Sequence, residues 1–195
     1  MSFLTRFRYI LAVAALLLVS GAGSHPVLMA QETAAPMPAS AVVKAHTFVS
    51  MDPVARNSDF QIAVVVDIAS GYHMNSHKPL DSYLIPTTLT SQLPSGITLS
   101  DTIYPPGKNE KFPFSPDKPL NVYTGSVTLR LKLNAAASAA LGATSVPIIL
   151  RYQACNNSAC LPPVKLPLSV QVQVAAAGAK GHAAHPEIFS SAPAH

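Results

Sequence analysis

An alternation of apolar and polar residues in the second half of the chain most constrains its fold. Between residues 127 and 133 every second residue is Val or Leu, and the residues between them are Thr, Arg and Lys. Successive side chains of a β-strand point to opposite faces, so this spacing places all four apolar side chains on one face. The segment therefore predicts a strand with one face in a core and the other in water.

Five other runs have strand-like character, and turn signals separate them. The predicted strands are 60–68, 83–90, 97–104, 122–133, 146–154 and 166–174. Turns are indicated by "PSG" at 94–96 and "PPGKNE" at 105–110, and only 134–143 ("NAAASAALGA") favours one or two helical turns. Six or more short strands at this spacing, several with prolines that suit sheet edges, predict an all-β fold, an immunoglobulin-like antiparallel β-sandwich.

The N-terminus has the pattern of a secretory signal peptide. Arg6 and Arg8 precede an apolar run from Ile10 to Val19, and small residues follow. The run has about ten residues, whereas a membrane-spanning helix needs roughly 20. We predict a signal peptide over 1–30, with cleavage after Ser24 or Ala30, and a mature protein in a bacterial periplasm.

Two segments without hydrophobic periodicity flank the predicted strands. Residues 31–41 ("QETAAPMPASA") are rich in Ala, Pro and Ser, and so is the segment 175–195. Such compositions bury too little apolar surface to offset the entropy of ordering. The sequence therefore predicts a disordered linker at 31–41, one domain at 42–174 and a disordered tail at 175–195.

The charge balance argues against nucleic acid as a partner. Two of the 13 Lys and Arg residues lie in the predicted signal peptide, so the mature chain has a formal net charge of about +2 against its 9 acidic residues. No stripe of Lys and Arg would neutralise phosphates. No nucleotide, haem or phosphate motif is present either, so no cofactor is expected.

Cys155 and Cys160 are the only cysteines, and export to an oxidising compartment favours a disulfide between them. The closed loop has about six residues, so the chain-entropy model gives only about 2 kcal/mol of stabilisation. A short ring also tends to be reducible and competent in exchange. From the residues alone, three readings stay open: a structural staple, a redox dithiol and part of a metal site.

The segment "YQACNNSACLPP" (152–163), followed by a strand, resembles the N-terminal periplasmic domain of the thiol:disulfide interchange protein DsbD. The resemblance extends to "DIASGYHMNS" (67–76) and "IYPPGKNEKFPF" (103–114) and covers about 130 residues in the same order. It implies an immunoglobulin-like sandwich whose cysteine pair passes reducing equivalents between thioredoxin-like periplasmic proteins or domains. The family's membrane and thioredoxin-like domains have no counterpart in the sequence, so we expect a separate membrane electron donor.

The resemblance also implies roles for individual residues. Cys160 would form mixed disulfides with partner proteins, and Cys155 would resolve them. A cap loop with a central phenylalanine would shield the pair, and Phe112 matches it best, with Phe114 second. This chain departs from the family in two ways. It has four residues between its cysteines, where the family has five, and it has His73 and Asn75 at positions where the family has aromatic residues.

Several neighbours of the cysteines are candidates for the wall of the site, each with a structural alternative. Lys111 would favour a cysteine thiolate, and Glu110 would oppose it. The family has acidic residues at both of these positions. The structural alternative for both residues is an exposed charged loop. Tyr72 and Tyr152 would wall the site, or pack as buried tyrosines at strand ends.

Two further patterns lie near the cysteine pair. Pro162 and Pro163 hold the chain extended after Cys160 and remove backbone donors. His73, Met74 and His77 would suit copper together with two thiolates, but no spacing defines a ligand set, so no metal is expected.

We therefore predict a thiol–disulfide oxidoreductase that relays reducing equivalents between proteins through Cys155 and Cys160, with no small-molecule substrate. The alternative is a non-catalytic periplasmic module that binds a partner protein and has a structural disulfide. The reduction potential of the pair separates the two hypotheses.

Overall fold

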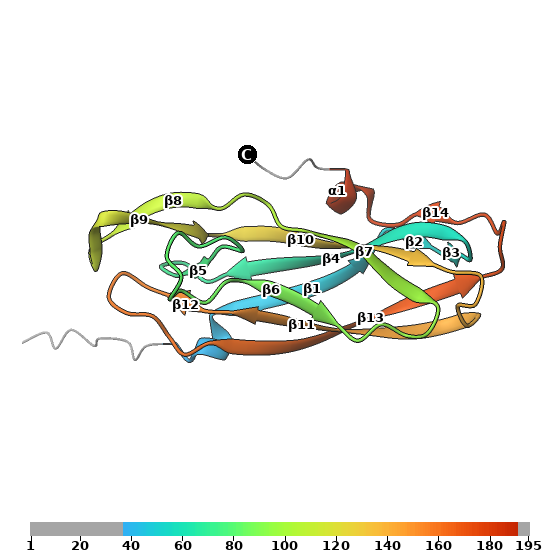
Figure 1. Ribbon diagram of the computed structural model, residues 1–195, viewed down its shortest axis with the longest axis horizontal. Coiled ribbons are helices and arrows are strands. Elements are labelled where there is room, and N and C mark those ends of the chain that lie inside the picture. The colour runs from blue at the N-terminus through green and yellow to red at the C-terminus, as the bar shows by residue number, and fades with distance from the viewer. Residues whose placement is uncertain (1–36, 191–195) are drawn as a thin grey trace, which may run out of the picture. The chain divides into compact units, whose positions relative to one another are not determined.

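Two four-stranded β-sheets pack face to face in residues 37–190, the part of the chain that the computed structural model describes (Figure 1). The first sheet has, in spatial order, β1 (Val43–Val49), β4 (Ser58–Ile68), β10 (Ser126–Ala135) and β7 (Ile97–Ile103). The second has β3 (Val54–Ala55), β13 (Val164–Ala175), β11 (Gly142–Tyr152) and β6 (Thr88–Ser91). All neighbours are antiparallel except β3 and β13. The predicted all-β, immunoglobulin-like sandwich is confirmed.

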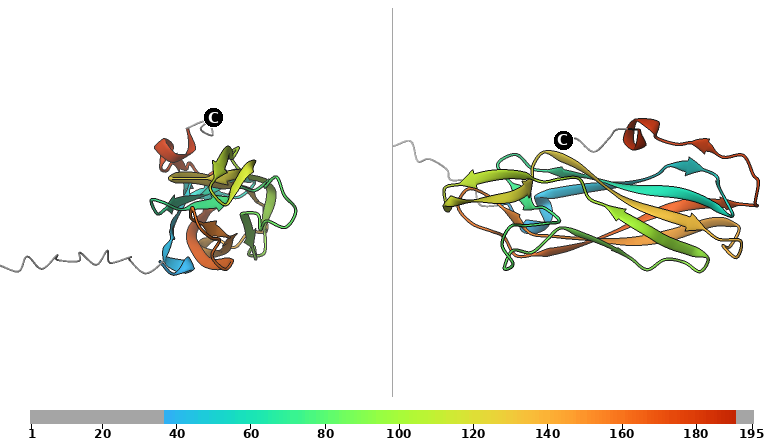
Figure 2. Two further views of the ribbon diagram at one scale, coloured as in Figure 1. Left: turned by 90° about the vertical axis from the view of Figure 1, so that its left-hand side faces the viewer. Right: turned by 45° about the horizontal axis from the view of Figure 1, so that its top comes forward.

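The apolar faces of the two sheets form the main core. Leu129, Leu131 and Leu133 of β10 are at most 1% exposed, as the alternation in the sequence predicts. Ile148 and Leu150 of β11, in the second sheet, are buried in the same core. The end-on view in Figure 2 shows the two sheets as separate layers.

A third, smaller sheet lies at one end of the sandwich, on the left in Figure 1. Its strands, in spatial order, are β12 (Ala154–Cys155), β5 (His73–Asn75), β9 (Ser115–Tyr123) and β8 (Lys108–Phe112). Leu84, Phe112, Leu120 and Val122 form a small second core beside it. This sheet brings the cysteine loop and the β8–β9 hairpin to the same end of the molecule.

Several predicted elements differ in the structure. Residues 134–143 contain no helix, because β10 continues to Ala135 and β11 begins at Gly142. The predicted strand 122–133 is the end of β9 and most of β10, joined by a turn at Gly125, whose φ of 65° suits glycine. Only the end of the predicted strand 83–90 is extended, as β6. The strands β1 and β8 were absent from the sequence prediction; β8 is mostly charged and is stabilised by pairing with β9.

The predicted disordered tail is wrong for residues up to 190. Within it, β14 (His182–Ala183) pairs with β2 (Met51–Asp52), and α1 (Pro186–Phe189) follows. Arg130 Nη2 donates a hydrogen bond of 2.7 Å to the Ile188 carbonyl oxygen and so ties α1 to β10. These contacts are tertiary, so local composition does not reveal them.

At the other end of the domain, η1 (Ala39–Ala41) lies within the predicted linker. The predicted signal peptide and residues 191–195 lie outside the described residues. Within 37–190, no helix combines the length and apolar character needed to cross a membrane.

Candidate functional site

The two cysteines form a disulfide at the end of the third sheet. Cys155 ends β12, and Cys160 pairs with it as an isolated β-bridge, with an S–S distance of 2.03 Å. Immediately after the loop, Leu161 N donates a hydrogen bond of 2.8 Å to the Ala154 carbonyl oxygen. The two ends of the loop are therefore paired as a small hairpin.

The two ends of the disulfide differ in exposure. Cys155 is 0% exposed, whereas Cys160 lies on the surface. A thiolate that attacks a disulfide needs access to one sulfur in line with the S–S bond. Of the two residues, Cys160 offers that access.

Asn156 determines the conformation of the loop between the cysteines. Its Oδ1 accepts hydrogen bonds from Ser158 N (2.8 Å) and Ala159 N (2.9 Å), which is the geometry of an Asx turn. Its own backbone N donates to the Ala159 carbonyl oxygen at 3.0 Å. One side chain thus satisfies two backbone donors in an exposed loop.

His73 lies directly opposite Cys155 in the pairing of β5 with β12. Opposed residues of antiparallel strands have side chains on the same face and Cβ atoms about 4.5–5.5 Å apart. His73 is 2% exposed, and its Nε2 is buried without a hydrogen-bond partner. Burial lowers the pKa of His73 to about 4, because the charged ring loses its hydration.

Phe112 covers the ring of His73. The two ring centroids are 3.9 Å apart with an interplanar angle of 20°. The pairing of β8 with β9 shifts register between Glu110 and Phe112, and such a bulge re-aims the side chains around it. Phe112 is 9% exposed and packs in the small second core, whereas Phe114 is 40% exposed and its ring lies 6.3 Å from that of His73.

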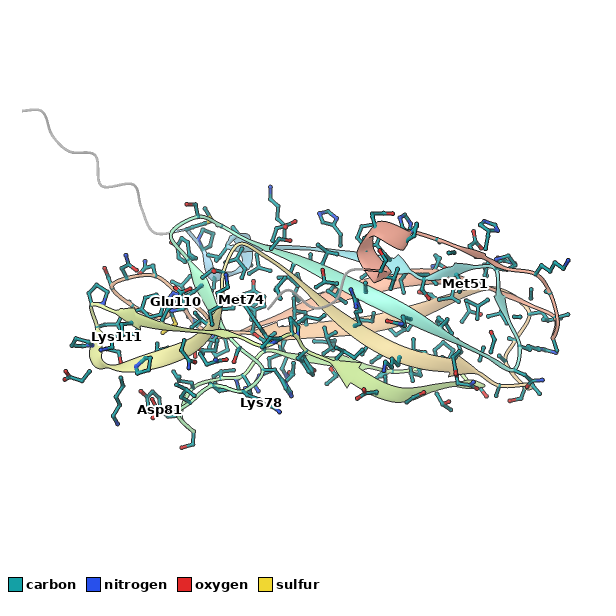
Figure 3. The ribbon with its side chains drawn as sticks, turned by 90° about the horizontal axis from the view of Figure 1, so that it is seen from above. Met51, Met74, Lys78, Asp81, Glu110 and Lys111 are labelled. Carbon is teal, nitrogen blue, oxygen red and sulfur yellow. A yellow bond between two sulfur atoms is a disulfide. The ribbon has the colours of Figure 1, made fainter. Side chains whose placement is uncertain are left out.

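An open pocket of about 460 Å³ borders these residues. Tyr72, His73, Glu110 and Phe112 line it, together with Asn157 of the cysteine loop and the turn at Gly125. Figure 3 shows Glu110 and Lys111 at the same end of the domain as Met74 of β5 and far from Met51. Glu110 is half-buried and Lys111 is exposed.

Tyr152, Pro162 and Pro163 are the remaining residues that the sequence predicts around the site. The ring of Tyr152 is fully buried in the main core, and its hydroxyl donates a hydrogen bond of 3.0 Å to the Ala39 carbonyl oxygen. Tyr152 is thus a core tyrosine and not part of the site wall. Pro162 and Pro163 are exposed and connect Cys160 to β13.

Asn75 and Gln153 connect β5 to the cysteine loop, and sequence reasoning did not single out either as a site residue. Asn75 Nδ2 donates to Gln153 Oε1 (3.3 Å) and to the Ile85 carbonyl oxygen (3.1 Å). Gln153 Nε2 donates in turn to the Leu161 carbonyl oxygen at 3.3 Å. The signal for Asn75 was that it replaces an aromatic residue of the resembled family; His73 shares this signal and was also considered as a copper ligand.

The two histidines of "HMNSH" do not meet at one site: His73 lies opposite Cys155, whereas His77 has other neighbours. The ring of His77 stacks on Tyr104 at 3.6 Å, and its Nδ1 lies 3.0 Å from the Thr87 carbonyl oxygen. In the described part of the chain, no group of three His, Cys, Asp or Glu side chains is placed to hold a metal ion.

Comparison with known protein families identifies a match over most of the chain. The family model for the N-terminal domain of the thiol:disulfide interchange protein DsbD matches residues 39–171. No curated protein matches the chain.

Two solved structures are similar to this chain. The reduced N-terminal domain of DsbD from Neisseria meningitidis is 20% identical, with a TM-score of 0.40, over 70% of this chain and 89% of that chain. The N-terminal periplasmic domain of ScsB from Proteus mirabilis is 15% identical, with a TM-score of 0.47, over 71% of this chain and 49% of that chain. This chain thus spans about half the length of the ScsB chain.

The family match covers well over half of the sequence, including both cysteines, His73 and the β8–β9 hairpin. This chain therefore belongs to the family of the N-terminal domain of the thiol:disulfide interchange protein DsbD.

Proposed function

We propose that this protein is a periplasmic thiol–disulfide oxidoreductase that relays reducing equivalents between protein partners through Cys155 and Cys160. Family membership and the disulfide support an exchange module. The observation that carries the proposal is the unequal exposure of the pair, with Cys160 on the surface and Cys155 buried.

Reduction of the pair begins with a partner thiolate that attacks Cys160 Sγ. The S–S bond breaks, its electron pair leaves on Cys155 Sγ, and a mixed disulfide joins Cys160 to the partner. The partner's second thiolate then attacks its own mixed-disulfide sulfur and releases Cys160. Two electrons and two protons pass to the pair, and the partner becomes the disulfide.

Oxidation of the pair runs through the same mixed disulfide. Cys160 attacks a client disulfide, and Cys155 then attacks Cys160 Sγ and releases the reduced client. Cys160 therefore makes the contact with partners, and Cys155 resolves the intermediate. Buried Cys155 is reached only by a sulfur that is already bound next to it, and this suits a resolving role.

Thioredoxin-like periplasmic proteins or domains are the proposed partners, with a separate membrane protein as the electron donor. The exposed end of the disulfide suits a protein partner because Pro162 and Pro163, which follow Cys160, are themselves exposed. Phe114, whose ring lies 6.3 Å from that of His73, is exposed as well. Such a surface offers apolar contact area to a partner protein, whereas a buried disulfide would be out of the partner's reach.

The reduction potential tests this function. The purified protein is equilibrated in glutathione or dithiothreitol redox buffers, and the fraction of free thiol is measured by alkylation and mass spectrometry. A relay is expected between about −120 and −270 mV, the range of thiol–disulfide exchange proteins. A potential below about −300 mV is typical of a structural disulfide and would favour the binding-module alternative.

A further inference from the structure

His73 has a buried nitrogen without a partner. Its side chain is 2% exposed, and Nε2 has no hydrogen-bond partner among the described residues. Buried polar atoms are normally paired, so an unpaired one calls for a physical explanation. The explanation lies in what the ring faces.

Two features of the site lie next to His73. On β12, directly opposite, is Cys155, and the ring of Phe112 stacks against His73 at 3.9 Å. Two other titratable side chains line the same pocket, Glu110 of β8 and Tyr72 just before β5. Of these three titratable residues, His73 is the one whose backbone is paired with that of a cysteine.

We propose that His73 Nε2 accepts the thiol proton of Cys155 when Cys155 resolves a mixed disulfide. This inference rests on the exchange function proposed above. Cys155 is 0% exposed, so its proton needs an acceptor within the protein. In the oxidised protein Cys155 Sγ carries no proton, so it cannot act as a hydrogen-bond donor to His73 Nε2.

The resolving step is balanced as follows. The Sγ–H proton of Cys155 moves to Nε2, and the Cys155 thiolate attacks Cys160 Sγ. The Sγ–Sγ bond of the pair forms, the bond from Cys160 to the client sulfur breaks, and the client thiolate leaves with the electron pair. The imidazolium then gives its proton to that thiolate, which restores the neutral ring.

The pKa of His73 decides when the ring can take the proton. Burial keeps this pKa at about 4, so at neutral pH the ring is neutral with a free lone pair, and it is a weak base until a thiolate forms beside it. A thiolate formed beside the ring favours the imidazolium, as in other Cys–His pairs. Glu110 lines the same pocket, and exposed Lys111 is adjacent to Glu110 in the chain.

A two-phase thiol assay isolates the step. Reduced protein is mixed with one equivalent of 5,5′-dithiobis(2-nitrobenzoate) in a stopped-flow instrument. The first release of thionitrobenzoate reports attack by Cys160, and the second reports resolution by Cys155. The variant His73→Phe keeps a flat ring against Phe112 and removes both nitrogens.

We expect His73→Phe to leave the first phase within about twofold of the wild type, because Cys160 attacks from the surface. The second phase should slow by about 100-fold at pH 7, since general bases contribute about 10²–10⁴-fold. The deficit should shrink as pH rises, because hydroxide replaces the missing base. His77→Phe is the matched control, because it replaces a histidine stacked on another aromatic ring away from the cysteines.

The possible results separate the two proposals. Equal second phases in His73→Phe and the wild type would overturn the role of His73 and leave the exchange function intact. Release of a single equivalent by the wild type, with no second phase, would overturn the exchange function and with it this inference.

A measurement on the wild type covers the case in which His73→Phe does not fold. The ¹⁵N resonance of His73 Nε2 is recorded at neutral pH in the oxidised and the reduced protein. We expect it to move on reduction, because the new Cys155 Sγ–H donates to a nitrogen that was unpaired. An unchanged resonance would overturn the proposal.

Discussion

The rings of Phe112 and His73 stack at 3.9 Å, and His73 lies opposite the buried end of the disulfide. Phe112 is also a member of the small core with Leu84 and Leu120. The resemblance described above implies only that Phe112 is a cap over the cysteine pair. The structure instead gives Phe112 two roles, since its ring covers the site and also holds the hairpin in place.

Phe112→Ala should therefore both open the site around His73 and destabilise the fold. Cys160 is already exposed, so we expect the faster reaction of the reduced protein with iodoacetamide at Cys155, because Phe112 no longer covers the ring of His73 opposite it. We also expect a loss of about 3 kcal/mol in the free energy of unfolding, at the lower end of the range for buried phenylalanines. Urea denaturation and timed alkylation measure the two effects.

Phe114→Ala is the matched control, because Phe114 is 40% exposed on the same hairpin. It should change stability little. If Phe114→Ala alone accelerates alkylation, the cap residue is Phe114. If Phe112→Ala destabilises without acceleration, the shielding hypothesis is wrong.

The unequal exposure of the cysteines predicts unequal trapping of partners. Cys155→Ser leaves the exposed Cys160 without its resolving partner, so mixed disulfides with thioredoxin-fold proteins should accumulate in a periplasmic extract. Cys160→Ser leaves only the buried sulfur and should trap much less. Non-reducing gels and mass spectrometry detect the adducts, and equal trapping by both variants would contradict the assigned roles.

Stability should fall in mild acid because of His73. Its pKa is about 4 in the folded protein, against an ordinary value of 6.5, so the unfolded chain binds the proton more tightly. The contribution to stability is complete above pH 6.5 and is lost as pH falls towards 4. At pH 4.5 the loss should be about 2–3 kcal/mol relative to neutral pH.

Urea denaturation at pH 7.5 and 4.5 measures this effect. His73→Phe has no ring nitrogen to protonate, so its loss of stability between the two pH values should be smaller than that of the wild type by about the same 2–3 kcal/mol that is assigned to His73. Identical changes in the two proteins would mean that His73 titrates normally in the folded state.

Asn156 should stabilise the cysteine loop through its side-chain oxygen. Asn156→Ala removes the acceptor of two backbone hydrogen bonds and should cost about 1–2 kcal/mol, as for other lost side-chain acceptors. Thermal denaturation of the oxidised protein measures the loss. Asn156→Asp keeps an acceptor oxygen and should lie close to the wild type; an equal loss in both variants would show that the Asx turn is not the cause.

The fold and the cysteine pair were largely predictable from local patterns. The alternation at 127–133 reports which face of a strand is buried, and β10 confirms it. Two cysteines five positions apart across turn-forming residues allow a hairpin disulfide, and the structure contains one. Both are local signals, because strand period and loop closure depend on neighbours in the chain.

The surroundings of the disulfide depended on tertiary structure. His73 and Cys155 are 82 positions apart, and only the pairing of β5 with β12 brings them together. Phe112 reaches His73 through a bulge in a hairpin whose charged and proline-rich strands have no hydrophobic period.

The all-β class, the alternation of buried and exposed faces along the strands and the possibility of a disulfide can be read from the sequence, because they follow from the spacing of side chains along one strand or loop. The unequal exposure of Cys155 and Cys160, the place of Tyr152 in the core and the neutral histidine opposite Cys155 become visible only in the folded protein. Burial and pairing between distant strands depend on how whole sheets pack, and no local pattern in the chain encodes them.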